Sequence, residues 1–236
     1  MTFKRIAFAL AALLLLAILG VGSFLVWQSQ AGGDPDFFER EIAAFEATDS
    51  REMPPPNGIV FTGSSSIRLW DTLADDMAPL PVLNRGFGGA HMEHVVHNAH
   101  RIVTPYEPLA VVVFVGGNDI GSGKSASQVA EDFRSFLEIV RAELPDTDIW
   151  LLSMKPSKLR WDKWPIMQEL DVALRAFAQS DEHVRFVNTG EVLLGPDGTP
   201  DDVYIFDGLH LNAVGYSRWT SVLRPLLMAQ YGPTSE

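Results

Sequence analysis

The sequence predicts an α/β fold in which a parallel sheet carries helices on both faces. Segments with the patterns of strands and of helices alternate along the chain from residue 58 to residue 230. Residues 109–115 form a continuous apolar run, which is typical of a parallel strand buried on both faces. Glycine-bearing turns follow three of the expected strands. Because ligands bind at the carboxyl ends of the strands in such sheets, these turns are the first candidates for a site.

The alternation divides the chain into elements and regions. Strands are expected at residues 58–62, 81–84, 109–115, 148–154 and 184–188. Helices are expected at residues 92–103, 127–144, 164–180 and 212–230. Phe38, Ile42 and Phe45 recur at four and three residues, which predicts a short amphipathic helix before the first strand. We therefore expect an N-terminal segment (1–30), a linker with this short helix (31–57) and one globular domain (58–232).

The N-terminal segment has the pattern of a membrane anchor. Lys4 and Arg5 precede residues 6–27, which contain no charged residue. A helix over this run would be roughly 33 Å long, enough to cross a bilayer core of about 30 Å. A cleaved signal peptide, the alternative, usually has a shorter apolar core, but Ala31 stands at a possible cleavage site. With Lys4 and Arg5 on the cytoplasmic side, the globular domain is expected to be periplasmic or extracellular.

Composition excludes several classes of function. Hydrophobic residues make up 47% and charged residues 20%, as in a globular protein. The chain has no cysteine, which excludes disulfides, a cysteine nucleophile and thiolate metal sites. Residues 28–236 carry 16 of the 18 Lys and Arg, because Lys4 and Arg5 lie outside, and all 30 Asp and Glu, a net charge of −14. Such a domain repels nucleic acid, so a DNA or RNA partner is excluded.

Groups suited to acyl transfer stand at the expected strand ends. This chemistry needs a hydroxyl nucleophile, a histidine base, a carboxylate that orients the histidine, and donors for the oxyanion. Ser65 follows the first strand, where a turn into a helix exposes its hydroxyl. Asp207 and His210 stand three residues apart, on one side of a single turn. Gly89 follows the second strand and lets an oxygen approach its backbone N–H, while Asn118 follows the third strand and can donate from its amide.

Four sequence blocks carry these residues: Gly-Ser-Ser-Ser at 63–66, 84–89, Gly-Gly-Asn-Asp at 116–119, and Asp-Gly-Leu-His at 207–210. In this order they resemble the SGNH hydrolases, also called GDSL-type esterases and lipases, over about residues 36–230. The resemblance implies a flavodoxin-like three-layer α/β/α sandwich with sheet order 2-1-3-4-5. It also implies Ser65 as nucleophile, His210 and Asp207 as its triad partners, and an oxyanion hole formed by the Ser65 N–H, Gly89 and Asn118. Ser64 replaces the family's usual aspartate, and a subgroup with Gly-Ser-Ser-Ser-Ile-Arg looks very similar to this chain.

The function expected from these residues is hydrolysis of a carboxylic ester in two steps through an acyl-enzyme on Ser65. No metal or cofactor is needed. The substrate is a small-molecule, lipid or acylated-glycan ester, and the acyl chain length and the oligomeric state stay open. One alternative is transfer of the acyl group to a sugar hydroxyl by the same triad. Another is a membrane-tethered binding module on a degenerate hydrolase fold, against which the complete set of catalytic residues argues.

Two further patterns suggest ligands but have simpler explanations. Histidines recur every third residue at positions 91, 94, 97 and 100. In helical projection they lie opposite the apolar stripe, so we expect a solvent-exposed face and not a metal site. The segment at 121–125, Gly-Ser-Gly-Lys-Ser, lacks the first glycine of a phosphate-binding loop, because position 118 is Asn.

Three residues are weaker candidates for substrate binding. His91 follows the loop that carries Gly89 and can border the site. Trp161 and Trp164 follow the fourth strand, in a loop that also carries the basic residues Lys158, Arg160 and Lys163. Because that loop opens on the carboxyl-end face, the two tryptophans either line the acyl or leaving-group pocket or anchor the loop.

Overall fold

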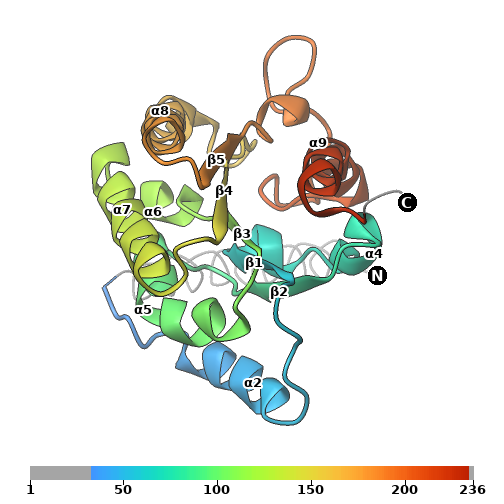
Figure 1. Ribbon diagram of the computed structural model, residues 1–236. Coiled ribbons are helices and arrows are strands. Elements are labelled where there is room, and N and C mark those ends of the chain that lie inside the picture. Colours follow the sequence, from blue (N-terminus) through green and yellow to red (C-terminus); the bar gives the residue numbers. More distant parts are fainter. Residues whose placement is uncertain (1–32, 234–236) are drawn as a thin grey trace, which may run out of the picture.

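The computed structural model describes residues 33–233, so the expected anchor over residues 1–30 lies outside the described residues. Five strands form one parallel sheet in the order β2-β1-β3-β4-β5, which confirms the order expected from the resemblance (Figure 1). The strands are β1 (Ile59–Gly63), β2 (Val82–Gly86), β3 (Ala110–Phe114), β4 (Asp148–Leu152) and β5 (Val184–Val187).

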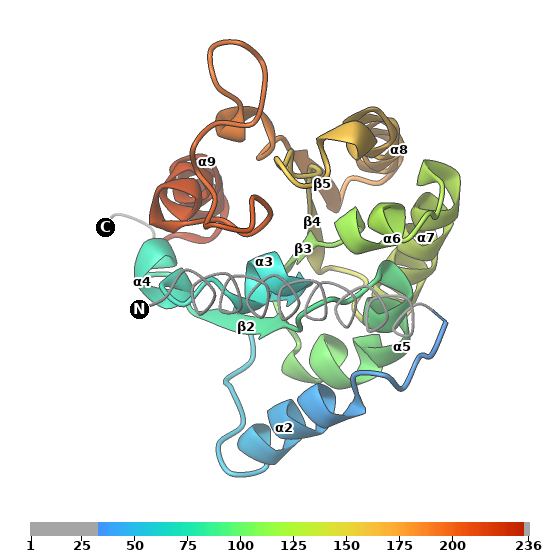
Figure 2. The ribbon, with the colours of Figure 1, turned by 180° about the vertical axis from the view of Figure 1, so that it is seen from behind.

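Side chains alternate between the two faces of the sheet and separate the core into two parts. Val111 and Val113 of β3 pack with α5 (Met92–Ile102), α7 (Ala126–Glu143) and α8 (Trp164–Ser180) on one face. Val112, between them, packs with α4 (Leu73–Met77) and α9 (Ala213–Tyr231) on the other. Figures 1 and 2 show these two layers of helices on opposite sides of the strands. The expected three-layer arrangement is confirmed.

The predicted amphipathic helix is α2 (Glu39–Asp49), which packs outside α5. Ile42 and the preceding Phe38 are buried in the core on the α5 side. Two charged contacts fix the helix: Arg101 of α5 binds Glu39 and Glu46, and Asp49 at its end accepts from Arg85 and Tyr106. Residues 38–49 are therefore packed against the same core as the domain that follows.

The helix expected after the turn at Ser65 is α3 (Ser65–Arg68). The other short elements near the turns were not expected from the sequence. These are α4, α6 (Gly117–Gly121) and the 3₁₀ turns η1 (Thr104–Tyr106), η2 (Trp161–Lys163) and η3 (Glu191–Leu193). Each spans at most five residues. A segment of one turn is too short to show a helical period, so periodicity could not reveal it.

The expected solvent-exposed histidine face is wrong for two of its four members. His91 and His94 are fully buried, whereas the side chains of His97 and His100 are about half exposed and pair with Asp36 and Glu143. His94 is covered by the segment before α2. Its Asp34 carbonyl oxygen lies 3.2 Å from His94 Nε2, and the Phe38 ring packs edge-on against the His94 ring at 4.9 Å between centroids.

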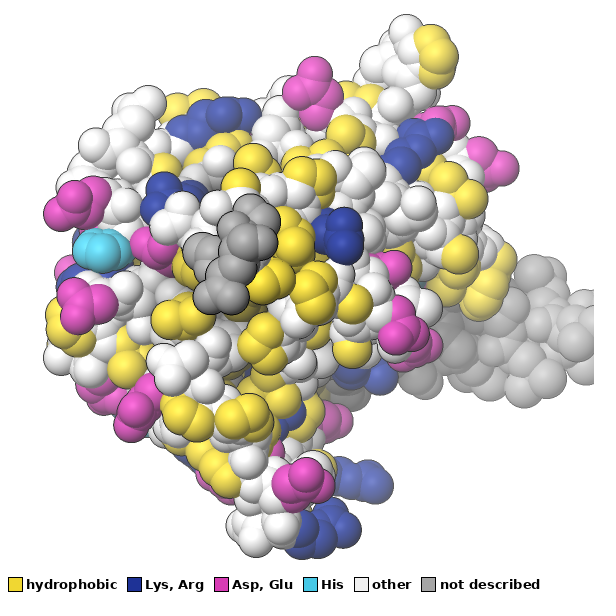
Figure 3. Space-filling model, turned by 45° about the vertical axis from the view of Figure 1, so that its right-hand side comes forward, with side chains coloured by type: hydrophobic (Ala, Val, Ile, Leu, Met, Phe, Trp, Pro, Cys, Tyr) yellow, Lys and Arg dark blue, Asp and Glu magenta, His cyan; other side chains and the backbone are white. Residues whose placement is uncertain are grey.

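The surface is mixed in character. On the face drawn in Figure 3, hydrophobic side chains gather near the middle, and acidic and basic side chains lie mainly around them. The acidic excess of the chain, −12 overall, therefore does not form one continuous field on this face. Within residues 33–233, no helix is both long enough and apolar enough to cross a membrane.

Candidate active site

A glycine at the end of β1 places Ser65. Gly63 has φ +131°, and a Cβ atom there would lie 2.0 Å from the Phe114 carbonyl oxygen of β3. Only glycine allows this close approach, which turns the chain into α3 directly above the strand ends. Ser65 is the first residue of α3 and is 9% exposed.

The loop before α9 brings an imidazole and a carboxylate to Ser65. His210 Nε2 lies 2.9 Å from Ser65 Oγ, and His210 Nδ1 lies 2.6 Å from Asp207 Oδ2. The other carboxylate oxygen, Oδ1, accepts from the backbone N–H groups of Leu209 and His210, both at 2.9 Å. Although burial raises the pKa of Asp207, these hydrogen bonds outweigh it and hold the pKa below its ordinary value. Asp207 is therefore an ionised acceptor that fixes the ring of His210.

A small pocket opens beside the Ser65 hydroxyl. The empty space between its walls is about 360 Å³, with open solvent at the mouth included. Phe114, Met167 and Leu209 supply its apolar walls, and Asn118 and Arg160 supply polar groups. No carboxylate is among the described residues that line it.

Asn118 has both ends of its amide held. Its Nδ2 donates to the Ala90 carbonyl oxygen at 3.0 Å, and its Oδ1 accepts from both terminal nitrogens of Arg160 at 3.1 Å. Ala90 follows Gly89, which has φ +87°. The hydrogen bond therefore joins α6 to the loop between β2 and α5, and the two expected oxyanion donors come from segments in direct contact. Gly89 itself does not line the pocket.

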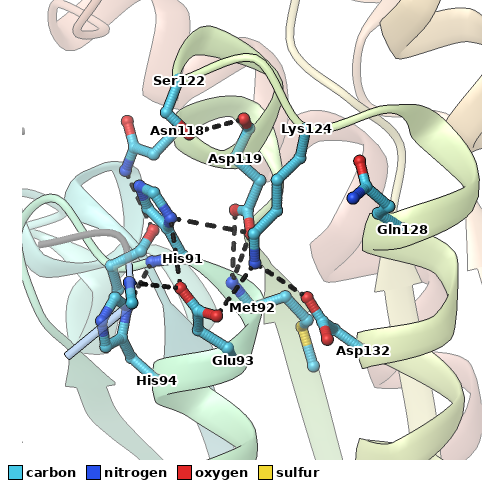
Figure 4. Close-up of polar contacts among 12 residues, drawn as sticks. His91, Met92, Glu93, His94, Asn118, Asp119, Ser122, Lys124, Gln128 and Asp132 are labelled. Atoms are coloured by element: carbon cyan, nitrogen blue, oxygen red, sulfur yellow. Dashed lines mark hydrogen bonds and ion pairs between the residues drawn. The ribbon is translucent and has the colours of Figure 1, made fainter. Parts of the chain in front are cut away.

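A buried ion cluster lies behind this junction. Met92 N–H donates to both oxygens of Asp119, at 3.1 and 3.2 Å, so the carboxylate ties the start of α5 to α6. Burial raises the pKa of Asp119 to about 6, although Lys124 nearby acts in the opposite direction. Figure 4 shows the Lys124 ammonium between three carboxylates, with Nζ–O distances of 3.1, 3.5 and 3.1 Å to Glu93, Asp119 and Asp132. The lysine of the Gly-Ser-Gly-Lys-Ser segment thus has an electrostatic role inside the fold.

None of the three weaker candidates lines the Ser65 pocket. His91 is fully buried in the ion cluster and does not line the pocket (Figure 4). Burial lowers its pKa to about 4, so the ring is neutral at pH 7. Trp161 and Trp164 stack on each other, with centroids 5.9 Å apart. Trp164 lines a second pocket, between α8 and η3. Within residues 33–233 no cluster of His, Asp and Glu is arranged to hold a metal ion.

Lys155 and Arg160 line the pocket but were not assigned a role from the sequence. Lys155 is buried, and its Nζ donates to Ser66 Oγ at 3.1 Å and to the Leu209 carbonyl oxygen. Burial lowers its pKa to about 7, helped by the nearby Arg160 and opposed by Asp207. Both residues follow β4. Their only signal in the sequence is a position at the carboxyl end of a strand.

Several known proteins are similar to this chain in sequence. The model of the GDSL-like Lipase/Acylhydrolase family matches residues 57–218. The chain is 27% identical over 197 residues to platelet-activating factor acetylhydrolase IB subunit alpha2 of Homo sapiens, covering 80% of this chain and 82% of that protein. It is 28% identical over 192 residues to subunit alpha1 of Bos taurus, covering 76% and 78%.

Solved structures show the same fold. A GDSL-like lipase from Bacteroides thetaiotaomicron has a TM-score of 0.71 at 19% identity, covering 80% of this chain and 98% of that one. A carbohydrate esterase family 3 protein from Talaromyces cellulolyticus has a TM-score of 0.60 at 16% identity, covering 76% and 100%. At these identities, the similarity to the solved structures shows a shared fold alone.

Proposed function

Because this chain belongs to the GDSL-like lipase/acylhydrolase family, and is thus an ester hydrolase, we propose that it cleaves carboxylic esters through an acyl-enzyme on Ser65. The observation that carries the proposal is the continuous hydrogen-bonded series Ser65–His210–Asp207 at the carboxyl ends of the strands. Nucleophile, base and orienting carboxylate are in hydrogen-bond contact, which is the geometry that acyl transfer requires. Within the family, we place the chain in the subgroup whose first block reads Gly-Ser-Ser-Ser-Ile-Arg, at residues 63–68.

In the first step, Ser65 Oγ attacks the ester carbonyl carbon while His210 Nε2 takes its proton. Asp207 holds His210 Nδ1–H and stabilises the imidazolium that forms. The oxyanion of the tetrahedral intermediate accepts from the Ser65 N–H, the Gly89 N–H and the Asn118 amide. When the intermediate collapses, His210 gives the proton to the alcohol, which leaves. Water then attacks the acyl-enzyme by the same route, and the carboxylic acid is released.

The pocket favours a short acyl group. Phe114, Met167 and Leu209 close the space beside Ser65 within a total volume of about 360 Å³ that includes the mouth. A long alkyl chain requires a longer apolar channel than these walls leave. With p-nitrophenyl acetate, butyrate and octanoate, kcat/KM should fall steadily with chain length, and Met167→Ala should improve butyrate relative to acetate. A wild-type preference for octanoate would contradict this part of the proposal.

Kinetics of three variants test the reaction itself. Ser65→Ala and His210→Ala should each lower the turnover of p-nitrophenyl acetate by several powers of ten, since members of a triad act as a unit. Ser221→Ala, at an exposed hydroxyl on α9, serves as the matched control and should keep wild-type turnover. If the Ser65 and His210 variants remain active, the triad assignment is wrong. If the wild-type protein hydrolyses none of these esters, a binding role gains support.

We further propose that residues 1–30 are an uncleaved anchor that holds the domain at the outer side of a membrane, near envelope esters. The support is the run at residues 6–27 without charge after Lys4 and Arg5. The full-length protein should stay with membranes in a carbonate wash and be released by detergent. Recovery of a soluble mature protein that begins at Gly32 would show a cleaved signal peptide instead.

A further inference from the structure

We propose that Arg160 is a positioning residue that fixes the amide of Asn118 so that one of its N–H groups is available to the oxyanion. The inference rests on the proposed function and adds to it a residue outside the four sequence blocks. Arg160 lies in the loop between β4 and α8, just before η2. It reaches Asn118 from a position 42 residues away in the chain.

The guanidinium of Arg160 contacts both the side chain and the backbone at the start of α6. Both terminal nitrogens of Arg160 donate to Asn118 Oδ1 at 3.1 Å, and one of them also donates to the Gly117 carbonyl oxygen at 2.9 Å. The side chain lies against Gly121 at the end of α6, where a Cβ atom would come within 2.9 Å of Arg160 Nε. The guanidinium is therefore seated on α6 by hydrogen bonds at one end of the helix and by close packing at the other.

The partners determine which end of the amide is oxygen. A guanidinium has only donors, so the Asn118 atom that faces it must be the oxygen. The Ala90 carbonyl has only lone pairs, so the atom that faces it must be the nitrogen. A flipped amide would set donor against donor and oxygen against oxygen, leaving buried groups unsatisfied. Two independent contacts thus hold one orientation.

This orientation serves the reaction in two ways. The amide nitrogen has two hydrogens; Ala90 takes one, and the other stays available in the pocket that Asn118 lines with Ser65. A positive charge on the amide oxygen also draws electron density from the N–H, which strengthens it as a donor. A donor held in place before the reaction stabilises the developing oxyanion without reorganisation.

Lysine could not replace this geometry fully. An ammonium is a point charge with three mobile donors, whereas the guanidinium fork is planar and spans the amide oxygen and the Gly117 carbonyl together. Arg160→Lys should therefore keep part of the effect and Arg160→Met none of it. Comparison of the two variants separates the effect of the positive charge from the effect of the planar guanidinium geometry.

The test is a double-mutant cycle between Arg160 and Asn118, with kcat and KM for p-nitrophenyl acetate as the readout. Arg160→Met should lower kcat by roughly 10²-fold with KM within about threefold, as for loss of one oxyanion donor. Arg160→Lys should recover about tenfold of that loss. In the Asn118→Ala background, Arg160→Met should lower kcat by less than about threefold further, because the group through which it acts is gone. Arg134→Met, at an exposed arginine on α7, is the matched control and should match wild type.

Three results would overturn the proposal: unchanged kcat in Arg160→Met, a loss confined to KM, or full additivity with Asn118→Ala. Additivity would mean that Arg160 acts on the substrate directly. If Arg160→Met does not fold, the Arg160→Lys cycle with Asn118→Ala decides in the same way. Ser65→Ala separates this outcome from failure of the proposed function: if it abolishes turnover while Arg160→Met does not change it, only the positioning role is refuted.

Discussion

His210 Nε2 lies 2.9 Å from Ser65 Oγ, although 145 positions separate the two residues in the chain. The contact depends on two loops that leave the same edge of the sheet, one after β1 and one before α9. Lys155 contacts both loops, since it donates to Ser66 and to the Leu209 carbonyl, the neighbours of Ser65 and His210. The alignment of Ser65 with His210 is thus held by a residue outside the Ser65–His210–Asp207 series.

Asp207→Asn tests the orienting role of the carboxylate. The amide can still accept from the Leu209 and His210 backbone, so the turn should persist, but it lacks the charge that stabilises the imidazolium. We expect kcat to fall by about 10²–10⁴-fold with a melting temperature close to wild type. A large fall in melting temperature with turnover preserved would assign Asp207 to folding alone.

Gly63→Ala tests the close approach of β1 and β3 that places Ser65. A Cβ atom would lie 2.0 Å from the Phe114 carbonyl oxygen, in addition to the strain of a positive φ. Gly123→Ala is the matched control, because its φ is also positive, +104°, but nothing lies within 4 Å. In urea unfolding, the free energy of unfolding should fall by roughly 1–2 kcal/mol for Gly123→Ala and by at least about 3 kcal/mol for Gly63→Ala. Equal losses would mean that the strain of the positive φ accounts for the whole effect and that the contact with the Phe114 carbonyl oxygen adds nothing.

Ile42→Ala tests whether α2 is part of the folded domain. Ile42 is fully buried beside α5, so its truncation should lower the free energy of unfolding by about 2–5 kcal/mol. Val172→Ala, at a side chain that is 69% exposed, should change it by less than about 0.5 kcal/mol. A negligible effect of Ile42→Ala in urea unfolding would show that α2 detaches before the domain unfolds.

The strands were predictable from the sequence, because apolar runs mark buried strands. The contact of Ser65 with His210 and of His210 with Asp207 was predictable from the four sequence blocks and their resemblance to a known family. The contacts of Arg160 and Lys155 were not predictable. Their partners lie 42 and 89 positions away in the chain, and no local sequence pattern indicates such contacts. The histidine face was mispredicted for the same reason. Helical projection describes one helix in isolation, whereas the chain that covers His94 comes from 60 positions earlier.

Lys155→Met tests the buried amine through the pH dependence of stability. The pKa of Lys155 is about 7 in the folded protein, below its ordinary value of 10.5. Between these values the unfolded chain binds a proton that the folded chain does not, so this residue makes stability rise with pH across that window. Relative to wild type, the variant should lose stability from pH 7 to pH 9, by up to about 1.4 kcal/mol per pH unit. A difference that stays constant in urea unfolding over this range would mean that the amine remains charged.

Covalent labelling of the nucleophile tests the central claim most directly. The full-length protein is treated with a fluorophosphonate, which reacts with activated serine hydroxyls, and the adduct is located by peptide mass spectrometry. We predict a single adduct on Ser65, which disappears in Ser65→Ala and is strongly reduced in His210→Ala, while Ser66→Ala is still labelled at Ser65. An adduct on Ser64 or Ser66 in the wild-type protein, or labelling that persists undiminished in Ser65→Ala, would contradict the assignment of Ser65 as the nucleophile.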